Sequence, residues 1–134
     1  MKNMLGNQVV KKQVVKKQVV KPIVLQPQGS LSCKNAATFQ QWITNVLLDS
    51  PTLCVLDMTH IDFIDSSGLF SLIAGLTSAR QQQCRLVLCN LQPSVRMTLE
   101  IIQLDREFEI FESLEAIPAK LDLVNLSLIS KGYV

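Results

Sequence analysis

Residues 53–76 read LCVLDMTHIDFIDSSGLFSLIAGL, and this stretch decides the fold of the 134-residue chain. It opens with the apolar run 53–56, which is typical of a β-strand covered on both faces. A polar turn at 57–62 and a second apolar pair at 63–64 follow. The next residues are Asp65-Ser66-Ser67-Gly68, after which apolar residues recur at 69, 72, 73 and 76, a helical spacing. The stretch therefore predicts a buried strand, an acidic loop, and a helix that begins with two serines and a glycine.

The first turn of this helix is a place where an anion is stabilised. Backbone N–H groups at a helix start lack partners within the helix, and the helix dipole is positive there. One interpretation of Ser66 and Ser67 is capping, since serine is a preferred N-cap residue. The other is a phosphorylation switch, because a phosphate adds about 1.5 to 2 negative charges and would be held on this turn.

The segment IDFIDSSGLFSLIAGL resembles the signature of the STAS domain, the fold of bacterial anti-sigma-factor antagonists. GSLSCKNAATFQQWITNVL resembles that family's second strand and first long helix, and CRLVLCNLQPSVRMTLEIIQLDREFEIFESLEAI resembles its later strands and helices. The resemblance covers residues 23–117. It implies a single α/β domain with a four- to five-stranded mixed sheet, about four helices, and the Ser67 turn at the C-terminal end of a strand.

The resemblance also implies a function. The family's phosphorylated serine matches Ser67, and Asp65 matches an aspartate that helps to place it, although Asp65 would also cap the helix. Ser66 and Gly68 complete the turn. The chain is then expected to bind an anti-sigma serine kinase when unphosphorylated and to leave it once Ser67 is phosphorylated, thereby regulating transcription. A serine phosphatase would act on the phosphorylated form.

Two other functions stay open. The chain could be a non-switching STAS adaptor subunit of a transporter-associated or scaffold complex, with Ser67 only a cap. It could also bind a small ligand or nucleotide at the helix start, although no glycine-rich loop supports this. An enzyme is not expected, because no Ser-His-acid set and no phosphate-binding loop occur.

Composition and cysteine spacing limit the remaining possibilities. The chain is 48% hydrophobic and 18% charged, which fits one soluble α/β domain. No apolar stretch approaches the ~18–20 residues of a membrane span, and MKNMLGNQVVKK lacks the apolar run of a secretory signal, so a cytoplasmic protein is expected. The spacing of the four cysteines predicts buried free thiols at Cys54, Cys84 and Cys89, and the single histidine, His60, is expected in a loop. No metal site and no cofactor are expected.

Residues 1–21 differ in composition from the rest of the chain. The unit V-V-K-K-Q occurs at 9–13 and 14–18 and begins again at 19. This segment holds six lysines and no acidic residue, whereas 22–134 holds seven basic and eleven acidic residues, so the net charges are +6 and −4. The segment is interpreted as a basic tail that is flexible or partly a first strand, since the resemblance to the STAS domain implies a first strand at about 14–20. The alternative is a weak electrostatic tether to an acidic partner, nucleic acid or an anionic membrane; direct nucleic-acid binding is not expected of the domain.

The flanking elements follow from hydrophobic spacing. We expect a strand at 23–25, a turn at 27–30, a helix at 35–48 and a strand at 85–89. The helix at 35–48 should face the sheet with an apolar stripe that consists of Ala36, Phe39, Ile43, Val46 and Leu47. Trp42 lies beside that stripe.

The helix expected at 93–104 carries two apolar stripes. Val95, Leu99 and Ile102 should dock it on the sheet. The second stripe consists of Met97, Ile101 and Leu104. It is either covered by the C-terminal extension or forms a partner surface next to the Ser67 turn.

The last elements are an edge strand at 108–111 and a helix that starts at Ser113 and stops or kinks at Pro118. Domain boundaries are thus expected at 1–21 for the tail, 22–117 for the STAS domain and 118–134 for the extension.

Overall fold

The computed structural model describes residues 22–118, which form two parallel sheets and three α-helices. The larger sheet has the strand order β2-β4-β6-β7, and the smaller sheet pairs β3 with β5. The strands are β2 (Pro22–Leu25), β3 (Gln28–Leu31), β4 (Leu53–Asp57), β5 (His60–Ile64), β6 (Arg85–Cys89) and β7 (Glu109–Phe111).

The two sheets arise because two neighbouring strands bend at the same level. β2 leads into β3 through Gln26 and Pro27, and β4 leads into β5 through Met58 and Thr59. Both halves pair in parallel, so one long ladder is split into two short ones. The register of the second ladder shifts after Gly29, whose φ of 83° lies in the left-handed region that glycine tolerates.

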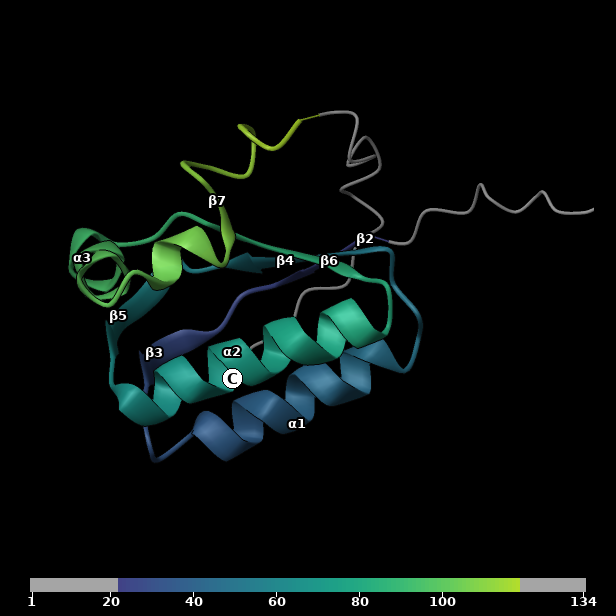
Figure 1. The fold of residues 1–134 in the computed structure, drawn as a ribbon, viewed down its shortest axis with the longest axis horizontal. Helices are drawn as coiled ribbons and strands as arrows, with labels where there is room; N and C mark the ends of the chain where they lie inside the picture. The colour runs from purple at the N-terminus through teal and green to yellow at the C-terminus, as the bar shows by residue number, and fades with distance from the viewer. Residues whose placement is uncertain (1–21, 119–134) are drawn as a thin grey trace, which may run out of the picture.

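Three helices cover the sheets from two sides. The elements are α1 (Ala36–Leu47), α2 (Ser66–Gln81), α3 (Pro93–Ile101) and the short 3₁₀-helix η2 (Leu104–Arg106). In Figure 1, α1 and α2 run side by side under the four-stranded sheet, while α3 lies next to β5 at the end where α2 begins. Their buried side chains and one face of the sheet form the main core, which includes Phe39, Ile43, Cys54, Leu56, Leu72, Leu86, Leu88 and Leu99.

The opposite face of the sheet forms a second, smaller core. Its strand residues alternate with those of the main core, as the two-residue period of a strand requires. They pack with Phe111 of β7 and with Leu114 and Ile117 from the chain that follows it. The strand residues of this core are Val24, Leu53, Val55, Val87 and Cys89. Figure 1 shows residues 112–118 on this side of the sheet, away from α1 and α2.

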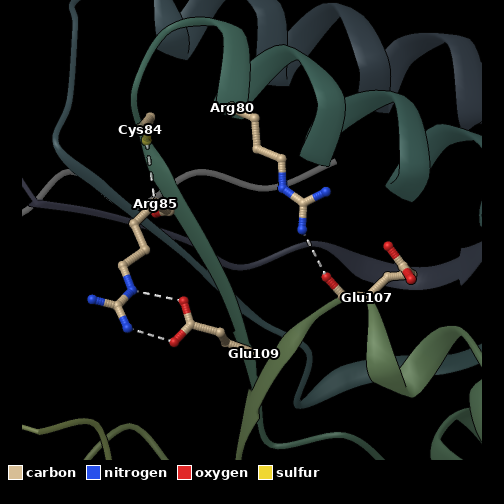
Figure 2. Close-up of polar contacts among 5 residues, drawn as sticks. All are labelled: Arg80, Cys84, Arg85, Glu107 and Glu109. Atoms are coloured by element: carbon tan, nitrogen blue, oxygen red, sulfur yellow. Dashed lines mark hydrogen bonds and ion pairs between the residues drawn. The ribbon is translucent and has the colours of Figure 1, made fainter.

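At the end of the four-stranded sheet where α2 finishes, two arginines, one on α2 and one on β6, donate hydrogen bonds to β7 and to the segment before it (Figure 2). Arg85, the first residue of β6, donates two hydrogen bonds of 2.6 Å to the carboxylate of Glu109. Arg80, in the last turn of α2, donates to the backbone carbonyl of Glu107 at 3.2 Å. β7 has only three residues, so these side-chain contacts supplement a short ladder.

The α/β STAS-like fold that the sequence predicts is confirmed, and three local expectations are corrected. Gln28–Ser30 belong to strand β3 rather than a turn, because the chain bends earlier, at Gln26 and Pro27. His60 begins strand β5 instead of lying in a loop, because residues 60–64 pair in parallel with β3, and Ile61 and Ile64 are the buried residues of this strand. The four residues between Ser113 and Pro118 hold a turn and not a helix, with Ala116 and Ile117 donating to the carbonyls of Ser113 and Leu114. So short a segment gains too few hydrogen bonds to form a helix.

All strand pairs within 22–118 are parallel. The strand expected at 14–20, the basic tail and the extension after Pro118 lie outside the described residues. Within 22–118, no helix has the length and apolar character that crossing a membrane requires.

Candidate functional site

The Ser67 turn lies where β5 ends and α2 begins. Asp65 is the N-cap of α2, and its carboxylate accepts hydrogen bonds from the backbone N–H of Gly68 at 2.9 Å and from that of Cys33 at 3.2 Å. The backbone N–H of Asp65 in turn donates to the carbonyl of Leu31, in β3, at 3.2 Å. One carboxylate therefore fixes both the helix start and the loop after β3, while Ser66 stays exposed and Ser67 partly exposed.

Gly68 is required by a close backbone contact and not by its own conformational freedom. A Cβ atom at this position would lie 2.0 Å from the carbonyl oxygen of Leu31 and 2.9 Å from Cγ1 of Ile64. Both atoms belong to the small sheet, so the first turn of α2 sits directly on its backbone. One turn later, the buried hydroxyl of Ser71 donates to the carbonyl of Gly68 at 2.6 Å. Asp65, Gly68 and Ser71 thus hold the turn rigidly and leave the serines at its surface.

Exposed apolar side chains gather at this end of the molecule. Phe70 lies three residues after Ser67, on the same side of α2, and is 70% exposed. Phe63, in β5, is also exposed, and so are Met97 and Ile101 on α3, the helix that packs beside β5. Large apolar side chains at the surface of a small domain mark an interaction site when they cluster. We call Phe63, Phe70, Met97 and Ile101 the apolar surface.

The two stripes expected on α3 are only partly as the sequence suggests. Val95 and Leu99 are buried and dock the helix, but Ile102 is 45% exposed because α3 ends at Ile101 and the chain turns away. Met97 and Ile101 are exposed, as a partner surface requires. Leu104 is partly buried and packs against the main core, so it does not belong to that surface. The burial of Ile102 and Leu104 is thus the reverse of the expectation, because Leu104 lies on η2 and not on α3.

Sequence reasoning missed Phe63 and Phe70 as surface residues. A usable signal was present for Phe70, since it falls outside the apolar positions 69, 72, 73 and 76 of its own helix. Phe63 was grouped with Ile64 as one apolar pair, although adjacent residues of a strand point to opposite faces.

A polar network lies beneath the site, at the carboxyl end of the four-stranded sheet. The carboxylate of Asp57 accepts hydrogen bonds from the Gln26 side chain at 2.9 Å, from the Asn90 side chain at 3.0 Å, and from the backbone and hydroxyl of Thr59. Burial would raise the pKa of Asp57, but the hydrogen bonds from Thr59, Asn90 and Gln26 outweigh it and hold the pKa below its usual range. The charged carboxylate of Asp57, at the end of β4, therefore connects the chain after β2 with the chain after β6, at the level where β2 and β4 lead into β3 and β5.

The cysteines lie as free thiols among the described residues. Cys54, Cys84 and Cys89 are buried and Cys33 is exposed, which confirms the sequence prediction for the three buried thiols. Burial raises the pKa of Cys84 to about 11 and that of Cys54 well above its usual value. No group of three or more potential metal ligands occurs within 22–118.

Comparison with known proteins places this geometry in a family. The family model described as the STAS domain matches residues 11–117. A Bordetella bronchiseptica protein named as a candidate anti-sigma factor antagonist, BtrV, is 33% identical over 92 residues, which are 69% of this chain and 79% of that protein.

Solved structures share the fold at lower identity. A crystal structure of a candidate anti-sigma factor antagonist from Thermotoga maritima aligns with a TM-score of 0.69 at 22% identity, over 79% of this chain and 92% of that one. A sulfate transporter family protein from Wolinella succinogenes aligns with a TM-score of 0.68 at 18% identity, over 80% and 91%. Structures of antagonists and of transporter-associated proteins therefore have this fold in common.

Proposed function

The chain belongs to the STAS domain family, and we propose that it is an anti-sigma-factor antagonist switched by phosphorylation of Ser67. Unphosphorylated, it binds a serine-kinase anti-sigma factor and so frees a sigma factor for transcription. Phosphorylated, it leaves the kinase until a serine phosphatase restores it. It acts in the cytoplasm as a binding partner and a substrate, with no catalytic step of its own.

One observation carries this proposal: Ser67 is accessible in a rigid helix start that borders exposed apolar side chains. Asp65 and Gly68 fix the turn, so a phosphate would alter its charge without disturbing the fold. The apolar surface supplies area for a partner, and Phe70 lies close enough along α2 for one docked protein to cover it together with Ser67.

Release follows from electrostatics. In the free protein, water and the N–H groups at the helix start solvate a phosphate on Ser67. A docked partner would strip that water away, and burial of an unpaired charge is costly. The kinase also brings its own nucleotide phosphates to Ser67, which adds repulsion. The phosphorylated form should therefore bind much more weakly.

Binding by charge-substituted variants tests the switch. In calorimetry with the purified kinase, Ser67→Asp should bind at least about tenfold more weakly than the unsubstituted protein, equivalent to ~1.4 kcal/mol. Ser67→Ala should bind normally. Ser66→Asp is the matched control, because it places the same charge one residue earlier, and it should weaken binding less than Ser67→Asp does. All three should stay folded, since an acidic group is favourable at a helix start.

If Ser67→Asp binds the kinase as tightly as the unsubstituted protein, the switch is wrong and a non-switching adaptor role replaces it. Transporter-associated proteins of the same fold make that role the second candidate.

Phosphorylation itself can be located directly. Incubation with the kinase and ATP, followed by peptide mass spectrometry, should place the phosphate on Ser67 and leave Ser66 unmodified. Phosphate on Ser66, or none from a kinase shown to be active, would contradict the assignment.

A further inference from the structure

The second face of the four-stranded sheet is more completely buried than the described chain explains. Val24, Val55 and Val87 stand in one row across three adjacent strands, as the pairings Val24 with Val55 and Val55 with Val87 show. Each is at most 2% exposed. Adjacent strands lie about 4.8 Å apart, so this row extends about 10 Å across the sheet.

The described cover of this face is small. It consists of Ile117, which is buried, and of Phe111 and Leu114, which are only partly buried. Phe111 stands on β7, three strands away from Val24 in the sheet order. The α-helices lie elsewhere: α1 and α2 under the other face, α3 beside β5 (Figure 1). Three side chains at one side cannot bury a face that extends across β2, β4 and β6.

We propose that residues 119–134 of this same chain dock on the second face and complete its core. The described chain reaches Ile117 on this face and ends one residue later, so residues 119–134 continue the chain from a point on this face. Its sequence, AKLDLVNLSLISKGYV, has leucines at 121, 123, 126 and 128. Sixteen residues span about 24 Å even as a helix, which exceeds the width of the row.

Residues 119–134 carry far less positive charge than residues 1–21 at the other end of the chain. Residues 119–134 carry two lysines and one aspartate, whereas 1–21 carry six lysines, which would be costly to place over an apolar face. The STAS family match ends at residue 117, so residues 119–134 lie outside the matched domain.

Two buried cysteines make the proposal measurable, because they lie on opposite faces. Cys89 belongs to the second face and Cys54 to the main core under α1 and α2. Burial, followed by the charges of Asp57 and Glu115, raises the pKa of Cys89 to about 12, which leaves almost no reactive thiolate at neutral pH. Uncovering the face should expose Cys89, lower its pKa and accelerate its alkylation, while Cys54 stays protected.

The experiment uses the full chain with Cys33→Ser, which removes the exposed thiol. In one variant, Leu121, Leu123, Leu126 and Leu128 are replaced by serine. In the matched control, Val9, Val10, Val14 and Val15 are replaced by serine instead. Alkylation by iodoacetamide is followed at each cysteine by peptide mass spectrometry. The leucine variant should label Cys89 at least about tenfold faster than the control does, with Cys54 unchanged in both.

Three outcomes would overturn the proposal. Cys89 could stay protected in the leucine variant, or become reactive only in the valine variant, which would make the N-terminal segment the cover. Protection in the unsubstituted chain could also fall on dilution, which would make a second copy the cover. If the leucine variant unfolds and exposes Cys54 as well, methyl NOEs in the unsubstituted chain decide: contacts from leucines of 119–134 to Val55 and Val87 support the proposal, and their absence overturns it.

Discussion

The two ends of the four-stranded sheet are held by opposite chemistry. At the carboxyl end, where α2 begins, two carboxylates bind neutral donors: Asp57 accepts from side chains and a backbone N–H, and Asp65 accepts from two backbone N–H groups. At the amino end, where α2 finishes, two arginines bind acceptors on β7 and the loop before it (Figure 2).

The difference lies in burial. Asp57 is buried and its partners come from the segments that directly follow β2, β4 and β6, whereas the Arg85–Glu109 pair keeps 49% and 42% of its side chains exposed. Buried hydrogen bonds to a charged group cost much to break, and exposed ion pairs cost little. The carboxyl end, which carries the Ser67 turn, should therefore be the rigid one, and the amino end the tolerant one.

The largest effect is expected from Gly68→Ala, because the new Cβ would overlap the carbonyl oxygen of Leu31. Overpacking typically costs 1–3 kcal/mol, and a clash with backbone cannot be relieved by a rotamer change, so a loss of about 3 kcal/mol or more is expected. Gly75→Ala in the same helix is the matched control. Its Cβ would meet Ile43 at an ordinary 3.6 Å, so it should stabilise α2 by about 0.5–1 kcal/mol. Urea unfolding of both measures the contrast; equal stabilities would contradict the close approach at Gly68.

The second effect belongs to Asp57. Asp57→Ala leaves the donors of Gln26, Asn90 and Thr59 without their acceptor, which should cost about 2 kcal/mol. The pKa of Asp57 is lowered in the folded state, so its contribution is complete above the unfolded pKa of about 4 and is lost as the pH falls through the folded value. Urea unfolding between pH 2 and 7 should show a shallower acid limb for Asp57→Asn than for the unsubstituted protein. Identical acid limbs would mean that Asp57 is not a stabilising charge.

Gly68 and Asp57 also show which features of the site the sequence does not predict. The apolar run 53–56 and the Asp65-Ser66-Ser67-Gly68 turn are local patterns, and the structure has β4 and the start of α2 where they predict them. The reason for glycine at position 68 is different, because it lies in Leu31, on another strand. The donors to Asp57 from Gln26 and Asn90 are likewise 31 and 33 residues away along the chain, so no local pattern reveals the network.

Hydrophobic spacing assigned a turn to the start of β3, and only the family resemblance indicated a strand after Gly29, for the related reason that its outward residues are polar. Gln28 and Gly29 are exposed, and only Leu31 is fully buried, so the segment lacks an apolar pattern until its partner β5 is known. Of the apolar surface, the sequence predicted Met97 and Ile101 but not Phe63 and Phe70. Phe63 forms an apolar pair with Ile64 in the sequence, and Phe70 falls outside the apolar positions of its own helix, but the structure is needed to show that both side chains are exposed.

The third effect is the helix cap. Asp65→Ala removes the acceptor for the backbone N–H groups of Gly68 and Cys33 and should cost about 1 kcal/mol. Asp65→Asn is the control, since asparagine caps a helix nearly as well, and it should cost only a few tenths of that. Thermal unfolding compares the two. If both variants lose the same stability, the charge of Asp65 matters and its capping geometry does not.

The smallest effect is expected at the amino end, from the ion pair of Arg85 with Glu109. The hydrogen bonds from Arg85 lower the pKa of Glu109, so the pair contributes above about pH 4.5 and is lost as the pH falls through the folded pKa of Glu109. Exposure limits its size: a double-mutant cycle of Arg85→Ala and Glu109→Ala should give a coupling free energy below about 1 kcal/mol at neutral pH. Salt should reduce it further, because exposed charges are screened within about 3 Å at 1 M ionic strength. A coupling above about 1 kcal/mol that survives 1 M salt would mean that the pair is effectively buried, and the contrast between the two ends of the sheet would no longer hold.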